Sequence, residues 1–308
     1  MRTIYFNEQV HSYTDELGNK YTSVTTVIDK YKPEFDRPTM ARNVYKKYYN
    51  RIGHRYYGMT IKEILYNWGD ITQKACDKGN KKHNYLEQII KEANGYKLIE
   101  GTQFINDRIY TVDNILENHS YGRVDLQYFI NKGLYNKYPT IFETIEYYSK
   151  LGYSIYPEIC VYSYEYLISG LIDVLLIKGN EFVILDWKTN KDDLYFRAGY
   201  FKRDYYGKET IEWVNTDNRL YKPLQNLQDC KGSLYTLQVA LYGLLTEMKG
   251  LKCKDLHLCH IRDPKDNELE KVEWHNIEYI KSDVQNMIDN HYESKYRTRN
   301  TQLVLNIL

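Results

Sequence analysis

The stretch "LISGLIDVLLIKGNEFVILDWKTNK", residues 167–191, contains two apolar runs with charged residues at their ends. The runs "DVLLI" and "FVILDW" read as strands, and the Gly-Asn pair between them, at 179–180, is a recognised two-residue β-hairpin loop. In the register that this loop sets, Asp173 lies directly opposite Asp186. Lys188 follows Asp186 by two residues and therefore projects from the same face of the strand. The sequence thus predicts two carboxylates and one ammonium group at the ends of buried strands.

This arrangement of charges favours a metal site. Cross-strand partners have Cβ atoms about 5 Å apart, and like charges at that distance are destabilising. A divalent cation would turn the repulsion between Asp173 and Asp186 into ligation, because Mg²⁺ prefers carboxylate oxygens and keeps waters that can attack a substrate. Gly170 would let a backbone or a ligand approach closely. The alternative is that these are ordinary charges at strand ends, with Lys188 bridging both acids.

Composition limits the classes of protein that the chain can represent. The chain has 308 residues and a net charge of +1, so no global field points to nucleic acid or membrane, and such binding would need a local patch. No apolar run is long enough to span a bilayer, and the first residues do not resemble a signal peptide. The 5 scattered cysteines fit a reducing compartment. We therefore expect a cytoplasmic protein that is not secreted and has no membrane partner.

Helical and strand patterns alternate along the chain. They predict an early hairpin that turns near Leu17-Gly18-Asn19 and leads into a helix capped near Ser23 or Thr25. Helix is then expected over 39–94, mixed strand and turn over 100–135, a helix over 140–153 and a strand over 154–164. After the hairpin at 167–191, the patterns predict a long polar stretch over 189–231, a helix over 232–250, strands over 255–261 and 270–277, and a final helix ending near Tyr296. Strands interspersed with helices indicate an α/β fold. We expect one structural unit, with a hairpin and helical lobe over 1–100 and the core over 101–308.

Several further motifs occur in a characteristic order. They are G-x-x-D at Gly170 and Asp173, D-x-K at Asp186 and Lys188, Q-x-x-x-Y at Gln238 and Tyr242, G-x-x-x-H-x-x-x-E at Gly79, His83 and Glu87, a strand acid after a proline at Glu158, and "YTSVTTVI" at 21–28. Together, over roughly residues 4–245, they resemble the PD-(D/E)XK nuclease superfamily. Within it they are similar to the RecB-like exonuclease branch, which includes phage and mitochondrial single-strand DNA exonucleases.

The resemblance implies a fold and a set of residue roles. The fold would be a restriction-endonuclease-like mixed central sheet flanked by helices, with an N-terminal helical lobe that carries His83 and guides DNA. The implied metal-site residues are His83, Glu158, Asp173, Asp186 and the backbone carbonyl of Trp187. The implied catalytic residues are Asp173, Asp186, Lys188, Gln238 and Tyr242. Because a lysine between two carboxylates stays protonated, we expect Lys188 to position water and stabilise charge rather than act as a strict base.

Each residue outside the hairpin also has an ordinary structural interpretation. His83 would be a surface histidine of a helix, paired with Glu87. Gln238 and Tyr242, which lie four apart on one helical face, would be the polar edge of a helix buried through its leucines. Glu158 would be a strand acid facing solvent.

A local basic segment supplies a candidate DNA-binding surface. The stretch "ARNVYKKYYNRIGHRYYGMTIK", at 41–62, interleaves cations and tyrosines and has no acidic residue. The residues that we expect to bind DNA are Arg42, Lys46, Lys47, Tyr48, Tyr49, Arg51 and Arg55. Cations that follow a phosphate backbone and rings that stack on bases suit single-strand binding. The alternative is a solvated helix whose tyrosines pack on the core. A second candidate stretch, at 196–208, is diluted by Asp204.

Other cofactors have weaker support. A histidine ligand suits Mn²⁺ somewhat better than Mg²⁺, so both ions remain candidates. We expect no iron–sulfur cluster, because the close C-x-x-C pair of the related nucleases is missing. Zinc bound by Cys253, His257, Cys259 and His260 is rejected, since alternation sends His260 to the opposite face from His257 and Cys259. "YGKET" lacks the glycine spacing of a phosphate loop, so no use of ATP is expected.

The sequence thus leads to a functional hypothesis. We expect a metal-dependent exonuclease that hydrolyses single-stranded DNA, or DNA with a free end, through a metal-activated water. The alternatives are a structure-specific or adaptation-type endonuclease of the same fold and a non-catalytic DNA-binding protein. A recombination or replication protein is compatible as a partner, and a phage-encoded chain would act in the host cytoplasm.

Overall fold

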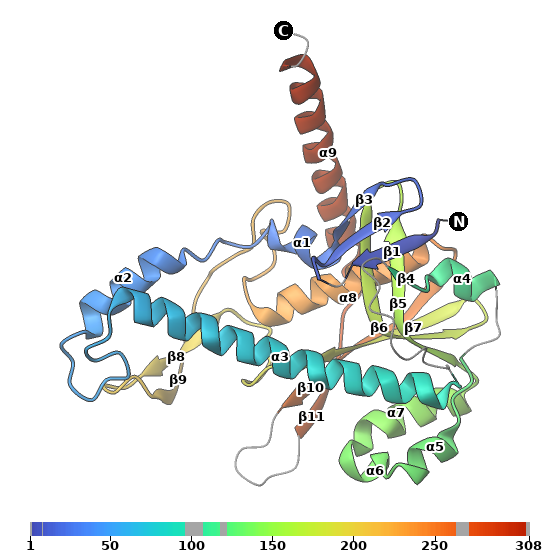
Figure 1. The fold of residues 1–308 in the computed structure, drawn as a ribbon, viewed down its shortest axis with the longest axis horizontal. Coiled ribbons are helices and arrows are strands. Elements are labelled where there is room, and N and C mark those ends of the chain that lie inside the picture. The colour runs from blue at the N-terminus through green and yellow to red at the C-terminus, as the bar shows by residue number, and fades with distance from the viewer. Residues whose placement is uncertain (1, 8, 96–106, 118–121, 263–270, 306–308) are drawn as a thin grey trace.

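The computed structural model describes residues 2–7, 9–95, 107–117, 122–262 and 271–305 of the chain (Figure 1). Its strands are β1 (Ile4–Asn7), β2 (Ser12–Asp15), β3 (Lys20–Ser23), β4 (Asp107–Arg108), β5 (Ser154–Ser163), β6 (Ile168–Lys178), β7 (Glu181–Lys188), β8 (Gly199–Arg203), β9 (Glu209–Asn215), β10 (Lys252–Arg262) and β11 (Lys271–Asn276). Its helices are α1 (Val24–Asp29), α2 (Arg37–Tyr48), α3 (Ile61–Ala93), α4 (Val112–Glu117), α5 (Leu126–Asn131), α6 (Leu134–Lys137), α7 (Pro139–Lys150), α8 (Lys231–Glu247) and α9 (Lys281–Leu305).

A mixed central sheet forms the core of the molecule. Its strand order is β11-β10-β7-β6-β3-β2-β1-β4, and β5 pairs with the other edge of β6. The β10–β7 and β3–β6 pairs are parallel and the other pairs are antiparallel. The predicted hairpin is present, and Lys178 pairs with Glu181 around a loop in which Gly179 has a φ of 59°. The predicted α/β class, with a mixed sheet flanked by helices, is confirmed.

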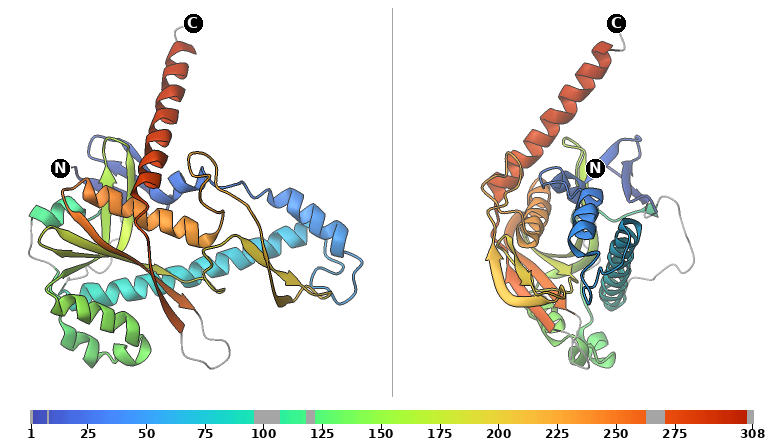
Figure 2. Two further views of the ribbon diagram at one scale, coloured as in Figure 1. Left: turned by 180° about the vertical axis from the view of Figure 1, so that it is seen from behind. Right: turned by 90° about the vertical axis from the view of Figure 1, so that its left-hand side faces the viewer.

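Helices cover both faces of the sheet. On one face, α8 packs with α1 and the start of α9 over a cluster that includes Ile172, Ile184 and Leu256. On the other face, α7 and the C-terminal half of α3 pack over a cluster that includes Val183, Leu185 and Trp187. The two views of Figure 2 show α8 and α3 on opposite sides of the strands. The strands of the hairpin are therefore buried on both faces, which explains why their sequences are continuously apolar.

Several predicted elements differ from those observed. The stretch 100–135 lies partly outside the described residues, and its described part contains the short helices α4, α5 and α6 as well as β4, so the prediction of strand and turn was wrong there. These helices have four to six residues, which is too short to show a helical period. They are stabilised by tertiary packing, for example of Phe129 against Phe142 at 4.7 Å between ring centroids.

Three further boundaries needed correction. The helical stretch 39–94 is interrupted at 49–60, between α2 and α3, and the final helix runs to Leu305 instead of ending near Tyr296. The polar stretch 189–231 contains the β8–β9 hairpin. Its turn is fixed locally, because the Asp204 carboxylate accepts hydrogen bonds from the backbone N–H groups of Tyr206 and Lys208. Ser23 caps α1 as predicted, since its Oγ accepts a hydrogen bond from Thr26 N.

The first hundred residues contribute both to the sheet and to a projection that we call the arm. The arm consists of α2, the 49–60 loop, the first turns of α3 and the β8–β9 hairpin, and it extends to the left in Figure 1. Its own small core is formed around Ala41, Tyr56 and Ile64. Within the described residues, no helix is both long enough and apolar enough to cross a membrane.

Candidate active site

The two edges of β6 explain where Asp173 lies. On one edge, β6 pairs with β3 only at Ile168 and Ser169, and it pairs with β7 only from Val174 onward. Between these two sets of pairs, residues 170–173 of β6 have no strand partner on this edge. Asp173 and Asp186 occupy the next opposing positions after the Val174–Leu185 pair, where the ladder ends. Asp173 Oδ2 instead accepts a hydrogen bond of 2.7 Å from Trp187 N.

The alternation of side chains also shifts by one residue at this point. Ile172 contributes to the α8 side of the sheet and Val174 to the α7 side, although they are two residues apart. The neighbouring strand β5 is also irregular here. Glu158 lies opposite Asp173 in the β5–β6 register and has a φ of 48°. A positive φ in a glutamate is uncommon and costs energy. The distortion of β5 and β6 opens the sheet around Asp173.

Asp186 and Lys188 form a buried pair beside Asp173. Asp186 is 1% exposed and lies in ion-pair contact with Lys188, yet its Oδ2 makes no hydrogen bond of good geometry. Burial raises the pKa of Asp186 to about 6, with Lys188 opposing the shift and Asp173 adding to it. Burial acts to lower the pKa of Lys188, but the charges of Asp186 and Asp173 raise it overall. The lysine is therefore a protonated cation at neutral pH.

His83 reaches this group from α3. Its Nδ1 lies 3.4 Å from Asp173 Oδ1. Burial acts to lower the pKa of His83, but the charge of Asp173 and the contact between the two raise it overall. Burial acts to raise the pKa of Asp173, and His83, Lys188 and the Trp187 N–H lower it overall. His83 and Lys188 thus offset part of the negative charge of the two carboxylates.

Gly79 allows α3 to approach the end of β7. A Cβ at this position would lie 2.8 Å from Thr189 Oγ1, in the residue after Lys188. Gly79 is buried and lies one helical turn before His83, on the same face. The close approach of the helix at Gly79 thus helps to bring His83 to Asp173.

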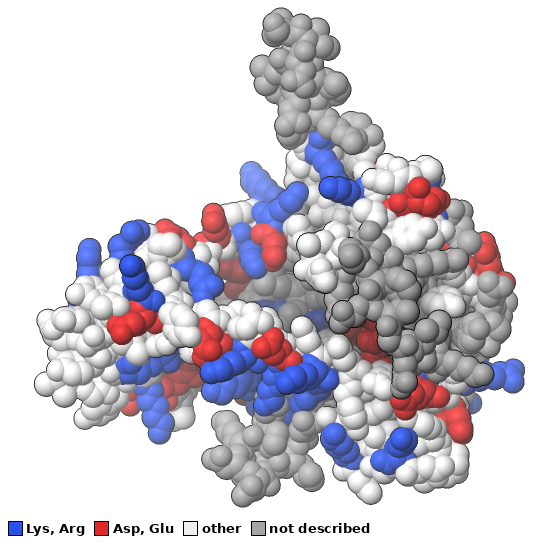
Figure 3. Space-filling model, viewed as in Figure 1, with Lys and Arg blue, Asp and Glu red and all other residues white. Residues whose placement is uncertain are grey.

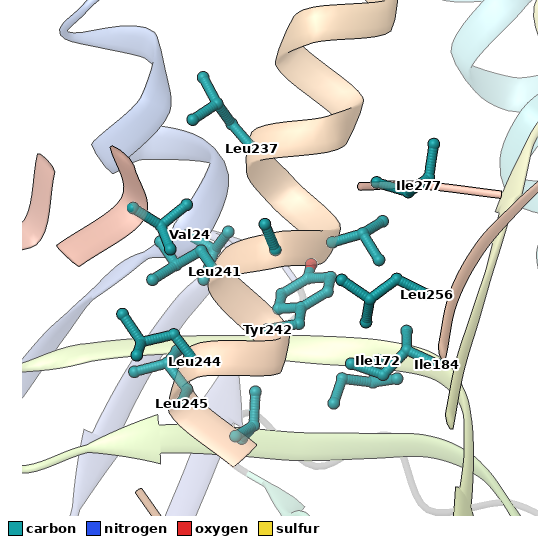
Figure 4. Close-up of a cluster of buried hydrophobic side chains, with 14 of the residues drawn as sticks. Val24, Ile172, Ile184, Leu237, Leu241, Tyr242, Leu244, Leu245, Leu256 and Ile277 are labelled. Atoms are coloured by element: carbon teal, nitrogen blue, oxygen red, sulfur yellow. The ribbon is translucent and has the colours of Figure 1, made fainter. Parts of the chain in front are cut away.

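Gln238 and Tyr242 lie on α8, behind the carboxylates. The ring of Tyr242 is 4% exposed and points into the core between α8 and the sheet (Figure 4). Its hydroxyl accepts a hydrogen bond of 3.0 Å from Gln238 Nε2. Gly170 makes room for it, because a Cβ there would lie 2.5 Å from Tyr242 Cε1. Burial, with the charge of Asp186, holds the pKa of Tyr242 well above its ordinary value, so the phenol is neutral.

Glu158, on β5, belongs to a second charged group, which it forms with Glu87 and Lys91 of α3. Its Oε2 lies 3.1 Å from Lys91 Nζ, and Lys91 also pairs with Glu87. Burial raises the pKa of Glu87 to about 8, and the neighbouring Glu158 adds to the shift. Of the described contacts, none joins Glu158 to Asp186. The implied metal ligand Glu158 therefore lies beside the carboxylate pair, with its charge directed toward Lys91.

Tyr235 and Asn190 are members of the site that the motifs did not predict. Lys188 Nζ lies 4.8 Å from the centroid of the Tyr235 ring, and the Tyr235 hydroxyl donates a 2.9 Å hydrogen bond to Asn190 Oδ1. Tyr235 precedes Gln238 by three residues and shares its helical face, a spacing that could have identified it. Lys91 was also not predicted, and its spacing of two helical turns after His83 on α3 could have identified it in the same way.

The basic segment over 41–62 lies in the arm. Arg42, Lys46 and Lys47 are exposed on α2, and Tyr49 is also exposed. Tyr48 instead stacks on His54, with ring centroids 3.8 Å apart and an interplanar angle of 2°. The tyrosines of the segment are thus divided between the solvent and the core of the arm.

The two candidate DNA-binding stretches meet in the arm. Arg51 lies over the ring of Tyr205 at 3.8 Å, and a Cβ on Gly207 would lie 2.6 Å from His54 Nε2. Arg55 lies over Tyr56 at 4.5 Å, and both arginines are therefore held by aromatic rings. Figure 3 shows Lys and Arg side chains over α2 and along α3, with acidic side chains between them. The arm joins a basic and aromatic surface to the helix that carries His83.

The predicted alternation along β10 is observed. His257 contacts the Tyr148 hydroxyl of α7 at 3.0 Å, whereas His260 Nε2 lies 3.2 Å from the carbonyl oxygen of Asn190. The two histidines therefore lie on opposite faces of the sheet. Cys259 is buried on the α7 side.

No family model matches this chain, and no curated protein matches it. The geometry of the described residues is consequently the basis for a functional proposal.

Proposed function

We propose that this chain is a metal-dependent deoxyribonuclease with a restriction-endonuclease-like core, acting as an exonuclease on single-stranded DNA or on DNA ends. The observation that carries the proposal is the facing pair Asp173 and Asp186, with Lys188 in contact with one carboxylate and His83 with the other. The four side chains come from α3, β6 and β7 and meet where the sheet opens.

The donor set fits a divalent cation. Asp186 is buried, and its Oδ2 contacts Lys188 without a hydrogen bond of good geometry, while its raised pKa reflects chiefly burial, to which the charge of Asp173 adds. Carboxylate oxygens with one imidazole suit Mg²⁺ or Mn²⁺. Asp173, Asp186 and His83 would hold the ion, together with the carbonyl of Trp187. When bound, such an ion polarises a phosphate oxygen and makes water a better nucleophile.

The protein groups around this position have separate tasks. Lys188, fixed by Asp186 and by the ring of Tyr235, stabilises negative charge that develops on the phosphate. His83 keeps Asp173 oriented, and Gln238 with Tyr242 supports the carboxylates from behind. The basic and aromatic arm is suited to hold an unpaired strand, because stacking on exposed rings is independent of sequence.

Substrate topology separates the exonuclease from an endonuclease with the same residues. An end-labelled linear single strand and its circular counterpart are each incubated with Mg²⁺ or Mn²⁺, using the wild type and the Lys188→Ala variant. We expect loss of the linear strand alone, and no loss with the variant. Cutting of both forms would make the protein an endonuclease, and binding without cleavage under either metal would make it a DNA-binding protein.

A further inference from the structure

A second group of potential metal ligands lies on β10 and β11, outside the carboxylate pair. His260 pairs with Glu273 across the two strands, and His275 follows Glu273 by two residues. The three side chains therefore project from one face of the sheet. One ligand atom from each lies within 4.8 Å of the others.

The two histidines present unused nitrogens to this position. His260 is fully buried, and its Nδ1 has no hydrogen-bond partner, nor does the buried Nε2 of His275. The other ring nitrogen of His260 lies 3.2 Å from the carbonyl oxygen of Asn190. A carbonyl oxygen only accepts, so Nε2 carries the proton and Nδ1 presents its lone pair. Histidines that bind metals are oriented in this way by a backbone carbonyl.

We propose that His260, Glu273 and His275 form a binding site for a transition-metal cation of the Zn²⁺ class. Two imidazoles with one carboxylate are a recurrent ligand set for zinc, with a fourth position left to water. At metal–ligand distances of about 2.0–2.2 Å, tetrahedral ligands lie about 3.4 Å apart. The three ligand atoms, which lie within 4.8 Å of one another, need to approach by up to about 1.4 Å to reach that spacing. This site does not depend on the proposed nuclease function.

The surrounding charges leave one carboxylate oxygen for the cation. Glu273 Oε1 is held by Lys271 at 2.6 Å and by Arg262 at 3.1 Å. Glu273 Oε2 faces His260 Nδ1 at 3.9 Å. Arg262 also pairs with Asp193, which offsets part of the positive charge near the site. Glu273 is partly exposed, so an ion can reach the position from solvent.

The position of the site indicates its role. His260 lies opposite Lys188 in the parallel β7–β10 register. Its Nε2 contacts the backbone oxygen of Asn190, and the side-chain Oδ1 of Asn190 accepts the hydrogen bond from the Tyr235 hydroxyl. A cation bound here would fix the segment that follows Lys188. We therefore expect it to hold this segment in place, separately from the cation proposed for the carboxylate pair.

Zinc binding to the full chain, without an affinity tag, tests the proposal. The chelator-stripped protein is titrated with Zn²⁺ in a large excess of Mg²⁺, and bound zinc is measured after gel filtration, together with the thermal midpoint. We expect about one ion per chain and a higher midpoint in the wild type. His275→Gln and Glu273→Gln should each lower the affinity at least about tenfold and lose the midpoint shift.

Two control variants locate the ion. His257→Gln removes a histidine on the opposite face of β10, and Asp186→Asn removes a carboxylate of the other site, and both should bind zinc as the wild type does. Wild-type zinc binding in His275→Gln and in Glu273→Gln would overturn the proposal. So would absence of bound zinc in the wild type. Glu273→Gln nearly preserves side-chain shape and keeps the test valid if His275→Gln does not fold.

Discussion

Asp186 is a buried acid, and in the absence of a metal ion its negative charge opposes folding even beside Lys188. Its pKa is about 6 in the folded protein and about 3.8 in the unfolded chain, so the folded state holds an extra proton between these values. The stability contributed by that proton is complete below the unfolded pKa and is lost as the pH rises through about 6. Above this pH, the cation-free protein retains an unfavourable negative charge.

The first prediction follows from this linkage. In the presence of a chelator at pH 8, Asp186→Asn should be more stable than the wild type by about 1–3 kcal/mol, because the amide cannot ionise. The difference should disappear toward pH 4. Urea unfolding at the two pH values measures it. Equal stability of the two proteins at pH 8 would contradict the proposed charge state of Asp186.

Asp173 supplies a control, because its pKa shifts in the opposite direction to that of Asp186. Its pKa is lowered overall, by His83, Lys188 and the Trp187 N–H against the effect of burial. Its contribution to stability is therefore present above the unfolded pKa and is lost as the pH falls through the folded pKa. Asp173→Asn should destabilise the same protein by about 1–3 kcal/mol at pH 8, through the weaker hydrogen bond to Trp187 N.

At the scale of elements, the contact between β6 and α8 positions the site. Gly170→Ala would place a Cβ 2.5 Å from the Tyr242 ring and 3.1 Å from Val24 Cγ2. Overpacking of this kind costs about 1–3 kcal/mol. We expect lower stability together with a slower nuclease rate, because the displaced ring moves Gln238. Thermal melts and cleavage assays on the same samples measure both effects.

Gly69→Ala on α3 is the matched control for this substitution. A Cβ at Gly69 would have no neighbour within 4 Å. The helix propensity of alanine should therefore raise stability by about 0.5–1 kcal/mol with no change in rate. If Gly170→Ala behaved like Gly69→Ala, the packing of Tyr242 against β6 would not matter for the site.

The elements also show what could be predicted from the sequence. The hairpin was predictable because the Gly-Asn loop and its apolar flanks are local signals, and they bring Asp173, Asp186 and Lys188 together. The break in β6 was not predictable, because it arises where the pairing of β6 with β3 ends and its pairing with β7 begins. The contact of His83 with Asp173 depends on the path of α3 across the sheet. Glu158 turns toward Lys91 because of a backbone irregularity that no local pattern indicates.

At the scale of the whole molecule, the arm and the carboxylate pair are far apart. From the start of α3 to His83 the helix rises about 33 Å. In the proposed nuclease, the cations of α2 would therefore contact the DNA strand well away from the scissile bond. They should affect binding and its salt dependence more than the rate of hydrolysis.

Replacing Arg42, Lys46 and Lys47 with glutamine tests this role of the arm. Loss of three phosphate contacts should reduce the slope of log affinity against log salt by about 2 for a single strand. Fluorescence anisotropy at several salt concentrations gives the slope. The control replaces Lys132, Lys137 and Lys150, near α5, α6 and α7 at the other end of the molecule (Figure 1). Equal slopes for the two triple variants would exclude the arm as the DNA-binding surface.

The central claim is that the group around Lys188 cleaves DNA. The most direct measurement is the Mg²⁺-dependent cleavage rate of a labelled linear single strand with the wild type, Lys188→Met and Lys191→Met. Lys191 is an exposed lysine three residues away. We predict that Lys188→Met remains folded and binds DNA but is slower by about 10²–10³, while Lys191→Met keeps the wild-type rate. A wild-type rate in Lys188→Met, or an equal loss in both variants, would contradict the account.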